Sequence, residues 1–409
     1  MLNKYRATRL TCYSGYVTQA ITVNLAPLLF VIFQQKFTLS LAYIALIPLI
    51  TFLIQIIIDA AAIFFVEKLT YRTLAVSSQV TSFLGLVLLS VLPTVMDPSW
   101  GIIIAILIYS SGSALAEVVM SPLAESLPRE EGEKSSMTIL HSFYSWGQAG
   151  VILVSTLLIR LLGNDLWFLL PLIWAVIPFV NTLMFLRVPM PETATHDSEH
   201  MVWKMLLKPS FVAAFVLMIC AGAAEQVMAQ WASLFAETGL GVSKVVGDIV
   251  GPCFFAVLMG VGRTGHGLFG ERYSMKKLLF ILSGFTALCY LITVFAPVPF
   301  VSLLGCGLCG LGVSIMWPGM LALCANSYPG AGASMFAVLA LGGDIGCSVG
   351  PYLSGLVSDA VSGSSNIASL CERFSLAPDQ LGLRAGFLAA IIFPLIMLVG
   401  VIFLKEKKK

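Results

Sequence analysis

The chain has 409 residues, of which 58% are hydrophobic and 11% are charged. Soluble proteins carry about 25% charged residues, so this composition excludes a soluble globular protein and indicates one that crosses a membrane several times. Nine cysteines lie mostly in apolar segments and are expected to be small packing residues rather than a disulfide framework. This expectation includes Cys306 and Cys309, which lie in a glycine-rich apolar run.

A helix needs about 20 apolar residues to cross the hydrocarbon core of a bilayer. Twelve segments of the sequence meet this requirement. In chain order they are residues 13–34, 41–66, 73–95, 101–125, 137–160, 166–187, 209–236, 246–268, 275–296, 299–325, 333–360 and 385–404. We therefore predict an all-α membrane protein with twelve transmembrane helices.

The distribution of Lys and Arg residues predicts the orientation of these spans. If both chain ends lie in the cytoplasm, the segments on the inside contain 18 of the 23 Lys and Arg residues. Membrane proteins carry their excess of basic residues on the cytoplasmic side. We therefore expect both termini in the cytoplasm and the protein in the plasma membrane, which in a bacterium is the inner membrane.

Polar residues in the first two spans are candidates for a transport path. Span one contributes Gln19 and Asn24 but no acid. In span two, Thr51, Gln55 and Asp59 are four residues apart and share one helix face. Asp59 lies past the midpoint of the span toward the cytoplasm. It is expected either at an inner gate, with a part in proton coupling, or in a bond that holds helices together.

Span four carries a stripe of serine and glutamate. Ser113, Glu117, Ser121 and Glu125 are four residues apart, Ser110 is three residues before Ser113, and all five fall on one helix face. An ionisable residue in hydrocarbon is expensive and normally points into a helix bundle or a watery cavity. The stripe therefore predicts a polar path through protein, with Glu117 as the functional residue. The alternative is a structural glutamate bonded to a neighbouring helix.

Span five begins with a polar face that contains His141, Ser145 and Gln148. His141 lies near the cytoplasmic end, where it is either hydrated or takes part in proton transfer. Gly147 and Gly150 are expected to permit close contact with another helix.

Residues 188–208 are rich in Pro and acidic residues in their first part and divide the spans into six plus six. We predict an N-terminal six-helix bundle at 1–187, a cytoplasmic linker at 188–208 and a C-terminal six-helix bundle at 209–409.

The two halves also share short sequence matches at equivalent spans. Met120-Ser121-Pro122 recurs as Met316-Trp317-Pro318, and Gly147 to Gly150 as Gly343 to Gly346, both 196 residues later; Glu67-Lys68 recurs as Glu271-Arg272, 204 residues later. A duplicated unit is indicated, and transporters built from repeats bind substrate between them.

Three spans of the second half contain candidate site residues. In span seven, Glu225 lies near mid-depth, and Gln226 and Gln230 share a face that could exchange hydrogen bonds with a hydroxylated solute. Asp344 in span eleven could bind substrate, a coupling ion or Arg263 of span eight. We assign to the substrate site Asn24, Gln148, Glu225, Gln226, Gln230, Trp317 and Asp344.

Several functions and ligands are not expected. No nucleophile–base pair or metal-ligand cluster stands out in the sequence, so we expect neither an enzyme nor a cofactor or metal site. The basic residues lie in scattered cytoplasmic loops, where topology accounts for them, so no nucleic-acid partner is expected. We expect a monomer in the lipid bilayer.

Twelve spans in two halves resemble the major facilitator superfamily. Glu67-Lys68-x-x-x-Arg72 is similar to its acid–base loop motif, and the second copy is similar to it at Gly262-Arg263, Gly267 and Glu271-Arg272. The resemblance implies two pseudo-symmetric six-helix bundles that alternate in access. It also implies a gating role for Glu67, Lys68, Arg72, Arg263, Glu271 and Arg272.

More particularly, the fourth-span region is similar to the fucose permease and glucose/galactose permease group. The residues that carry the resemblance are Glu117, Pro122, Leu127-Pro128, Glu130-Glu131-Gly132, Ser142-Phe143 and Gly147. The resemblance implies that Glu117 takes part in proton coupling and sugar binding. Members of the group also use an aspartate in the first helix, which this chain lacks.

The leading hypothesis is therefore a secondary active transporter that couples a proton to symport of a sugar or similar polyhydroxylated solute. Desolvation disfavours the charged form of a buried carboxyl group, so Glu117 is suited to carry a proton, with Asp59 as a second candidate. One alternative is a proton antiporter that exports amphipathic compounds, suggested by an aromatic and Met-rich lining with Met218, Met228, Met316 and Trp317. An alternative of another class is a membrane sensor that does not transport.

Overall fold

The computed structural model describes residues 5–39, 41–65, 68–127, 136–191, 205–269, 273–328, 332–364, 371–373 and 376–404. Within these ranges all regular structure is helical. Most of the expected linker, the acid-rich loop at 130–132 and the lysine-rich C-terminal end lie outside the described residues.

Each of the twelve expected spans coincides with helix, as predicted. The helices of the first half are α1 (Arg6–Phe37), α2 (Leu41–Phe65), α3 (Tyr71–Val95), α4 (Pro98–Ser126), α5 (Ser136–Leu162) and, after the short 3-10 helix η2 (Asn164–Leu166), α6 (Leu169–Arg187). Among the described residues, 10 helical segments between Tyr71 and Phe403 are long and apolar enough to cross a membrane, and α2 adds the shorter apolar stretch Leu46–Ala62.

The second half differs because several of its spans are interrupted. Its helices are α8 (Pro209–Leu234) with the π-helical η3 (Phe235–Gly239), α9 (Lys244–Asp248) with the π-helical η4 (Ile249–Cys253) and α10 (Phe254–Phe269), α11 (Met275–Phe295), α12 (Pro299–Val313), α13 (Met316–Ser327), α14 (Gly332–Ser362), α16 (Pro378–Ala390) and α17 (Ile392–Phe403). Span ten is thus built from α12 and α13, with a turn at Ser314 and Ile315 between them. Span twelve consists of α16 and α17.

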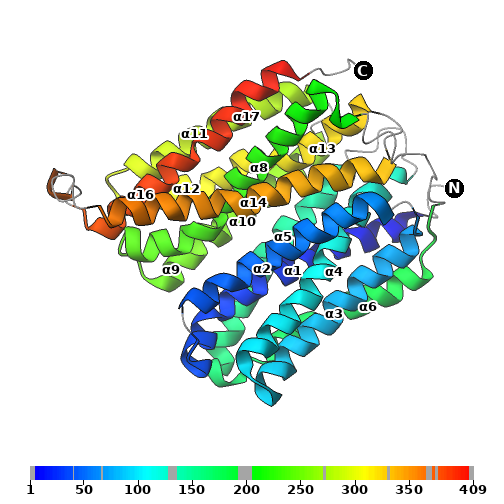
Figure 1. Ribbon diagram of the computed structural model, residues 1–409, viewed down its shortest axis with the longest axis horizontal. Coiled ribbons are helices and arrows are strands. Elements are labelled where there is room, and N and C mark those ends of the chain that lie inside the picture. The colour runs from blue at the N-terminus through cyan, green and yellow to red at the C-terminus, as the bar shows by residue number, and fades with distance from the viewer. Residues whose placement is uncertain are drawn as a thin grey trace. The chain divides into compact units, whose positions relative to one another are not determined.

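Contacts between residues divide the chain into two compact units (Figure 1). The first consists of Met1–Met205 and Tyr328–Leu341, and the second of Leu206–Ser327 and Gly342–Lys409. Within the first unit α3 packs on α4 and α6, and α1 packs on α5; within the second, α11 packs on α12 and α17. The bundle boundaries at 187 and 209 remain a prediction.

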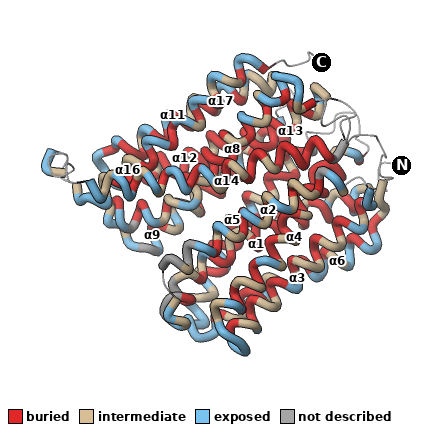
Figure 2. The backbone as a smooth tube through the Cα atoms, viewed as in Figure 1, coloured by how far each residue is buried: buried red, intermediate tan, exposed pale blue. Residues whose placement is uncertain are grey.

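Small residues allow helices within each unit to approach closely. A Cβ atom on Gly85 of α3 would collide with the backbone of Tyr109 in α4, and one on Gly310 of α12 would collide with the backbone of Phe255 in α10. Cys306 and Cys309 of α12 are free thiols and fully buried, in accord with the predicted packing role. Figure 2 shows buried positions along the inner sides of the helices and exposed positions along their outer sides. Many exposed positions are large and apolar, as expected where helices face lipid.

The glycine pair of span five behaves differently from the expectation. A Cβ atom on Gly147 would lie 2.9 Å from the Cβ atom of Ala20 in α1, so Gly147 is at a close helix contact. A Cβ atom on Gly150 would meet nothing within 4 Å among the described residues. The prediction for Gly150 was wrong, because α1 passes close to only one of the two positions.

One capping device occurs in both units. The guanidinium of Arg72, at the start of α3, donates to the carbonyl oxygens of Phe185 (2.7 Å), Leu186 (2.6 Å) and Val188 (2.8 Å) at the end of α6. The ammonium of Lys276, 204 residues later at the start of α11, donates to the carbonyls of Ile402 (2.6 Å) and Leu404 (2.7 Å) at the end of α17. Basic side chains satisfy the last carbonyls of a helix in this way. The duplication read from the sequence therefore extends to individual contacts.

Candidate functional site

The serine–glutamate stripe of α4 faces the protein interior. Helix α4 begins at Pro98, and the Asp97 side chain accepts hydrogen bonds from the first free backbone N–H groups. Ser110, Ser113 and Ser121 are buried, and Glu117 is only 8% exposed; Glu125, nearest the end of the helix, is half-buried. The carboxyl group of Glu117 is therefore withdrawn from lipid.

A neutral side chain contacts this carboxyl group. Gln19 of α1 donates a hydrogen bond from Nε2 to Oε2 of Glu117 at 2.6 Å, and both side chains are buried. The sequence indicated Gln19 only as a polar residue in a span without an acid. The sequence did not predict this pair, because the two residues are 98 positions apart. One signal was available: span one has no acid, so a residue of span one that contacts Glu117 is not another carboxyl group.

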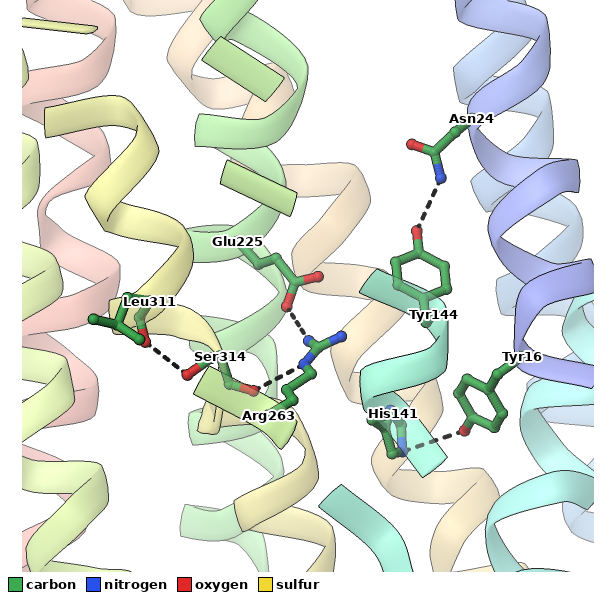
Figure 3. Close-up of polar contacts among 8 residues, drawn as sticks. All are labelled: Tyr16, Asn24, His141, Tyr144, Glu225, Arg263, Leu311 and Ser314. Carbon is green, nitrogen blue, oxygen red and sulfur yellow. Dashed lines mark hydrogen bonds and ion pairs between the residues drawn. The ribbon is translucent and has the colours of Figure 1, made fainter. Parts of the chain in front are cut away.

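One helical turn further along α4, three side chains from three helices meet. The hydroxyl of Tyr16 in α1 lies 2.7 Å from the Ser121 hydroxyl of α4 and 3.2 Å from Nε2 of His141 in α5. Ser121 Oγ and His141 Nε2 are 3.4 Å apart. The rings of Tyr16 and His141 meet edge to face, with centroids 4.7 Å apart. Figure 3 shows Tyr16 and His141 directed toward each other.

Amide side chains extend the polar interior of the first unit. Asn24 of α1 donates to the Tyr144 hydroxyl of α5 at 3.5 Å (Figure 3). Gln148, one turn beyond Tyr144, is 5% exposed, and its Oε1 has no hydrogen-bond partner within the described ranges. Gln55 of α2 donates to Ser113 at 3.3 Å, while its own buried Oε1 likewise finds no partner in the part of the chain described. Buried acceptors of this kind normally have a partner, so they are suited to receive a hydroxyl from a bound solute.

Asp59 lies one turn beyond Gln55 on α2 and is fully buried. Its burial agrees with the inward-facing stripe expected for span two.

The second unit contains a buried ion pair. Glu225 of α8 is 7% exposed, and Nη2 of Arg263 from α10 lies 3.0 Å from its Oε2. Nε of the same guanidinium donates at 2.9 Å to the carbonyl of Ser314, in the turn that interrupts span ten. The Ser314 hydroxyl donates to the Leu311 carbonyl at 2.6 Å (Figure 3). The sequence predicts Glu225 in the substrate site and Arg263 at a gate. The structure joins the two side chains by this ion pair, and both roles stay predictions.

The other expected substrate residues of the second half lie on α8, α13 and α14. Gln230 is exposed and donates to Gln226 at 3.3 Å. Trp317 is 8% exposed and lies against Gly343, where a Cβ atom would collide with its ring. Asp344, the next residue, is 3% exposed. The structure thus places Trp317 against the residue that precedes Asp344 and joins the two glutamines by a hydrogen bond.

The expected gating residues are only partly described. Lys68 is exposed, and Arg72 caps α6 as above. Glu67, Glu271 and Arg272 lie outside the described residues. Across the described ranges, no three His, Cys, Asp or Glu side chains lie close enough to hold a metal ion.

The sequence matches the Major Facilitator Superfamily over residues 12–351 and again over residues 253–409. The chain belongs to this superfamily. Its members are transporters rather than enzymes, and this chain is accordingly a multi-pass membrane transporter. No curated protein gave a significant match to the sequence.

Several solved structures share the fold of this chain over almost its whole length. The transporter FucP in its outward conformation is 17% identical, with a TM-score of 0.77 over 99% of this chain and 100% of that one. A variant of the Escherichia coli fucose:proton symporter FucP is 17% identical, with a TM-score of 0.73 over 96% of this chain and 99% of that one. The proton:xylose symporter XylE bound to 6-bromo-6-deoxy-D-glucose is 13% identical, with a TM-score of 0.74 over 99% of this chain and 97% of that one. At these identities the likeness shows the major facilitator fold, as the sequence predicted.

Proposed function

We propose that this transporter couples the movement of a proton to symport of a sugar or a similar polyhydroxylated small solute. Glu117 carries the proton. The observation that carries the proposal is the buried Glu117 carboxyl group bonded to the neutral amide of Gln19 at 2.6 Å.

A carboxamide is a suitable partner for a group that gains and loses a proton. The Gln19 amide donates from Nε2 to the ionised carboxylate, and after rotation its Oε1 accepts a hydrogen bond from the protonated acid. Both protonation states of Glu117 therefore have a hydrogen bond with this amide. This pairing supplies a partner at the span where related permeases use an aspartate.

The chemistry of the first unit supports a hydroxylated substrate. Asn24, Gln55 and Gln148 present amide groups in an interior that also contains several serine and tyrosine hydroxyls. The solved structures of like fold include a fucose:proton symporter and a proton:xylose symporter. In the second unit we propose Glu225, Gln226, Gln230, Trp317 and Asp344 as further substrate residues.

The proposal includes the arrangement in the membrane. Both termini lie in the cytoplasm of a plasma membrane, and the protein acts as a monomer. Transporters built from two repeats expose the site to each side in turn by rocking of one repeat against the other. Asp59 and the loop residues Lys68 and Arg72 belong to the inner gate.

The test uses purified full-length protein in proteoliposomes with labelled L-fucose, D-xylose and D-glucose. With an inward proton gradient, the wild type accumulates at least one of these sugars. Glu117→Gln lowers proton-driven accumulation by about a hundredfold, the effect of removing a positioned acid–base group, and retains sugar exchange. Glu125→Gln, which changes another glutamate of the same helix, is the matched control and keeps accumulation.

Preserved pH-driven accumulation in Glu117→Gln would overturn the proposal. Dye efflux without sugar uptake would favour export of amphipathic compounds instead. The methionines that suggested such an exporter are Met218, Met228 and Met316, and all three are buried.

A further inference from the structure

The Tyr16–Ser121–His141 cluster lies beside the Glu117 site but is not needed to hold its carboxyl group. It joins α1, α4 and α5 at a single point, and its members are 2%, 2% and 4% exposed. Polar side chains of this kind bond membrane helices to one another, and a chain of three groups that both donate and accept hydrogen bonds can in addition pass on a proton.

The cluster is aligned with Glu117. Ser121 follows Glu117 by one turn of α4, and Gln19, the partner of Glu117, follows Tyr16 by one turn of α1. The two contacts therefore form successive steps between the same pair of helices. His141 lies five residues after the start of α5, about 8 Å along the helix axis at 1.5 Å per residue. The cluster thus lies between Glu117 and the end of the unit at which α4 finishes and α5 begins.

The three groups have the chemistry of a proton path. Each hydroxyl donates one proton and accepts others, and a neutral imidazole accepts at Nε2 when Nδ1 carries its hydrogen. Histidine is also the side chain whose charge changes at physiological pH. Helix α5 packs against α1, α4 and η2. The titratable and charged groups on these elements are Arg6, Arg9, Cys12, Tyr13, Tyr16 and Lys36 of α1, Tyr109, Glu117 and Glu125 of α4, and Asp165 of η2. Glu117 and Glu125 lie one turn to either side of Ser121.

We propose that Ser121, Tyr16 and His141 conduct the proton released by Glu117 to the α4–α5 end of the first unit, where the positive-inside rule places the cytoplasm. This inference rests on the proposed function of Glu117. The O–H bond of the protonated carboxyl group breaks, and one water molecule passes the proton across the helical turn to Ser121. Each hydroxyl receives one proton and gives up one, and an N–H bond forms at Nε2 of His141. The imidazolium then releases a proton to water at the membrane surface, so one proton moves and no electrons are transferred.

The test compares His141→Gln with the wild type in proteoliposomes, with the panel of L-fucose, D-xylose and D-glucose. Glutamine keeps a hydrogen-bonding amide near the position of Nε2 but does not titrate. Proton-driven sugar uptake is expected to slow by about tenfold or more, and its pH dependence to flatten over roughly pH 5–8, where histidine titrates. Sugar exchange is expected to slow much less, because it needs no net release of a proton.

Further variants separate this role from a structural one. Tyr16→Phe keeps the ring and removes the hydroxyl, so it breaks the path in the same way even if His141→Gln fails to fold. His266→Gln removes another buried histidine, in α10, and is expected to leave the pH profile unchanged. The chain has four histidines, so the His141 signal in a ¹⁵N-histidine NMR spectrum is assigned by its loss in His141→Gln, and its titration is followed directly.

Each outcome bears on the inference. Wild-type uptake rate and pH profile in both His141→Gln and Tyr16→Phe would overturn it, as would equal loss of uptake and exchange in well-folded variants. If Glu117→Gln abolishes accumulation while both cluster variants behave as wild type, the path is wrong and the proposed function stands. If Glu117→Gln still accumulates sugar, the proposed function itself is wrong.

Discussion

The two compact units each bury a glutamate to nearly the same extent but give it different partners. Glu117 in the first unit meets the amide of Gln19, and Glu225 in the second meets the guanidinium of Arg263. The amide satisfies the carboxyl group in either protonation state. A buried guanidinium does not, because protonating or removing its partner leaves a positive charge without compensation. The comparison teaches that two carboxyl groups of similar burial can contact a neutral amide in one unit and a charged guanidinium in the other, and that only the first partner suits the proton-carrying role proposed above.

The framework around these glutamates is more alike than their chemistry. Arg72 and Lys276 cap the last helices of their units 204 residues apart, and Gly147 and Gly343 both lie at close contacts 196 residues apart. Duplication has therefore kept some of the packing contacts, although not all of them, while the polar side chains diverged. The following predictions test this distinction.

The largest expected effect comes from breaking the ion pair. Arg263→Met leaves Glu225 as a buried charge without its partner and should lower the free energy of unfolding by about 3–5 kcal/mol. The double variant Glu225→Gln with Arg263→Met should recover part of this loss, since no charge then remains buried. Reversible unfolding in bicelles measures both. Equal stability of Arg263→Met and the wild type would mean that the pair contributes nothing to the second unit.

A smaller effect is expected at equivalent glycines. A Cβ atom at Gly346 would collide with the backbone oxygen of Ile219, so Gly346→Ala must push α14 away from α8 at a cost of about 1–3 kcal/mol. Gly150, its counterpart 196 residues earlier, has open space, and Gly150→Ala should gain up to about 0.5–1 kcal/mol from helix propensity. Thermal unfolding of the two variants in one detergent provides the comparison. Similar shifts of both melting temperatures would contradict the unequal packing.

The smallest effect concerns the caps. Arg72→Gln loses donors to three carbonyls and Lys276→Gln to two, so each should cost about 1 kcal/mol after allowance for partial exposure, with the larger loss at Arg72. Lys277→Gln, at the exposed neighbouring position, is the control and should be neutral. Melting temperatures again give the measurement. A control shift as large as that of Lys276→Gln would show that charge alone, without the contacts, sets the effect.

Much of the fold could be predicted because apolar runs of membrane length leave few alternatives. The interruption of span ten was missed although Pro318 signals it, because a proline has no N–H to bond the carbonyl four residues earlier, here that of Ser314. The group that bonds this carbonyl instead, the Arg263 guanidinium, comes from another span and is not visible in a single segment. The same reasoning explains Gly150, whose spacing from Gly147 suggested a contact that depends on the course of α1.

The sequence predicted which single residues of the candidate site face the interior, but it did not predict which of them contact one another. The four-residue period of α4 indicated that Glu117 and Ser121 face inward, and both are buried. Which side chains meet them depends on the vertical register of α1 and α5, and no local pattern specifies that register. The contacts of Gln19 with Glu117 and of Tyr16 with Ser121 therefore emerged only from the structure. Arg263 was assigned to a gate because it lies near a loop motif, yet its long side chain reaches into the helix packing.

The turn at Ser314 has a mechanical consequence for span ten. In an unbroken helix, backbone hydrogen bonds set the bending stiffness along the whole length. Here Pro318 offers no N–H to the Ser314 carbonyl, which a side chain of α10 bonds instead, so α13 can tilt relative to α12 without opening a regular backbone ladder. The flexibility of this joint is thus adjustable by substitution at one position on a different helix, whereas stiffening an ordinary span would require changes along its own length.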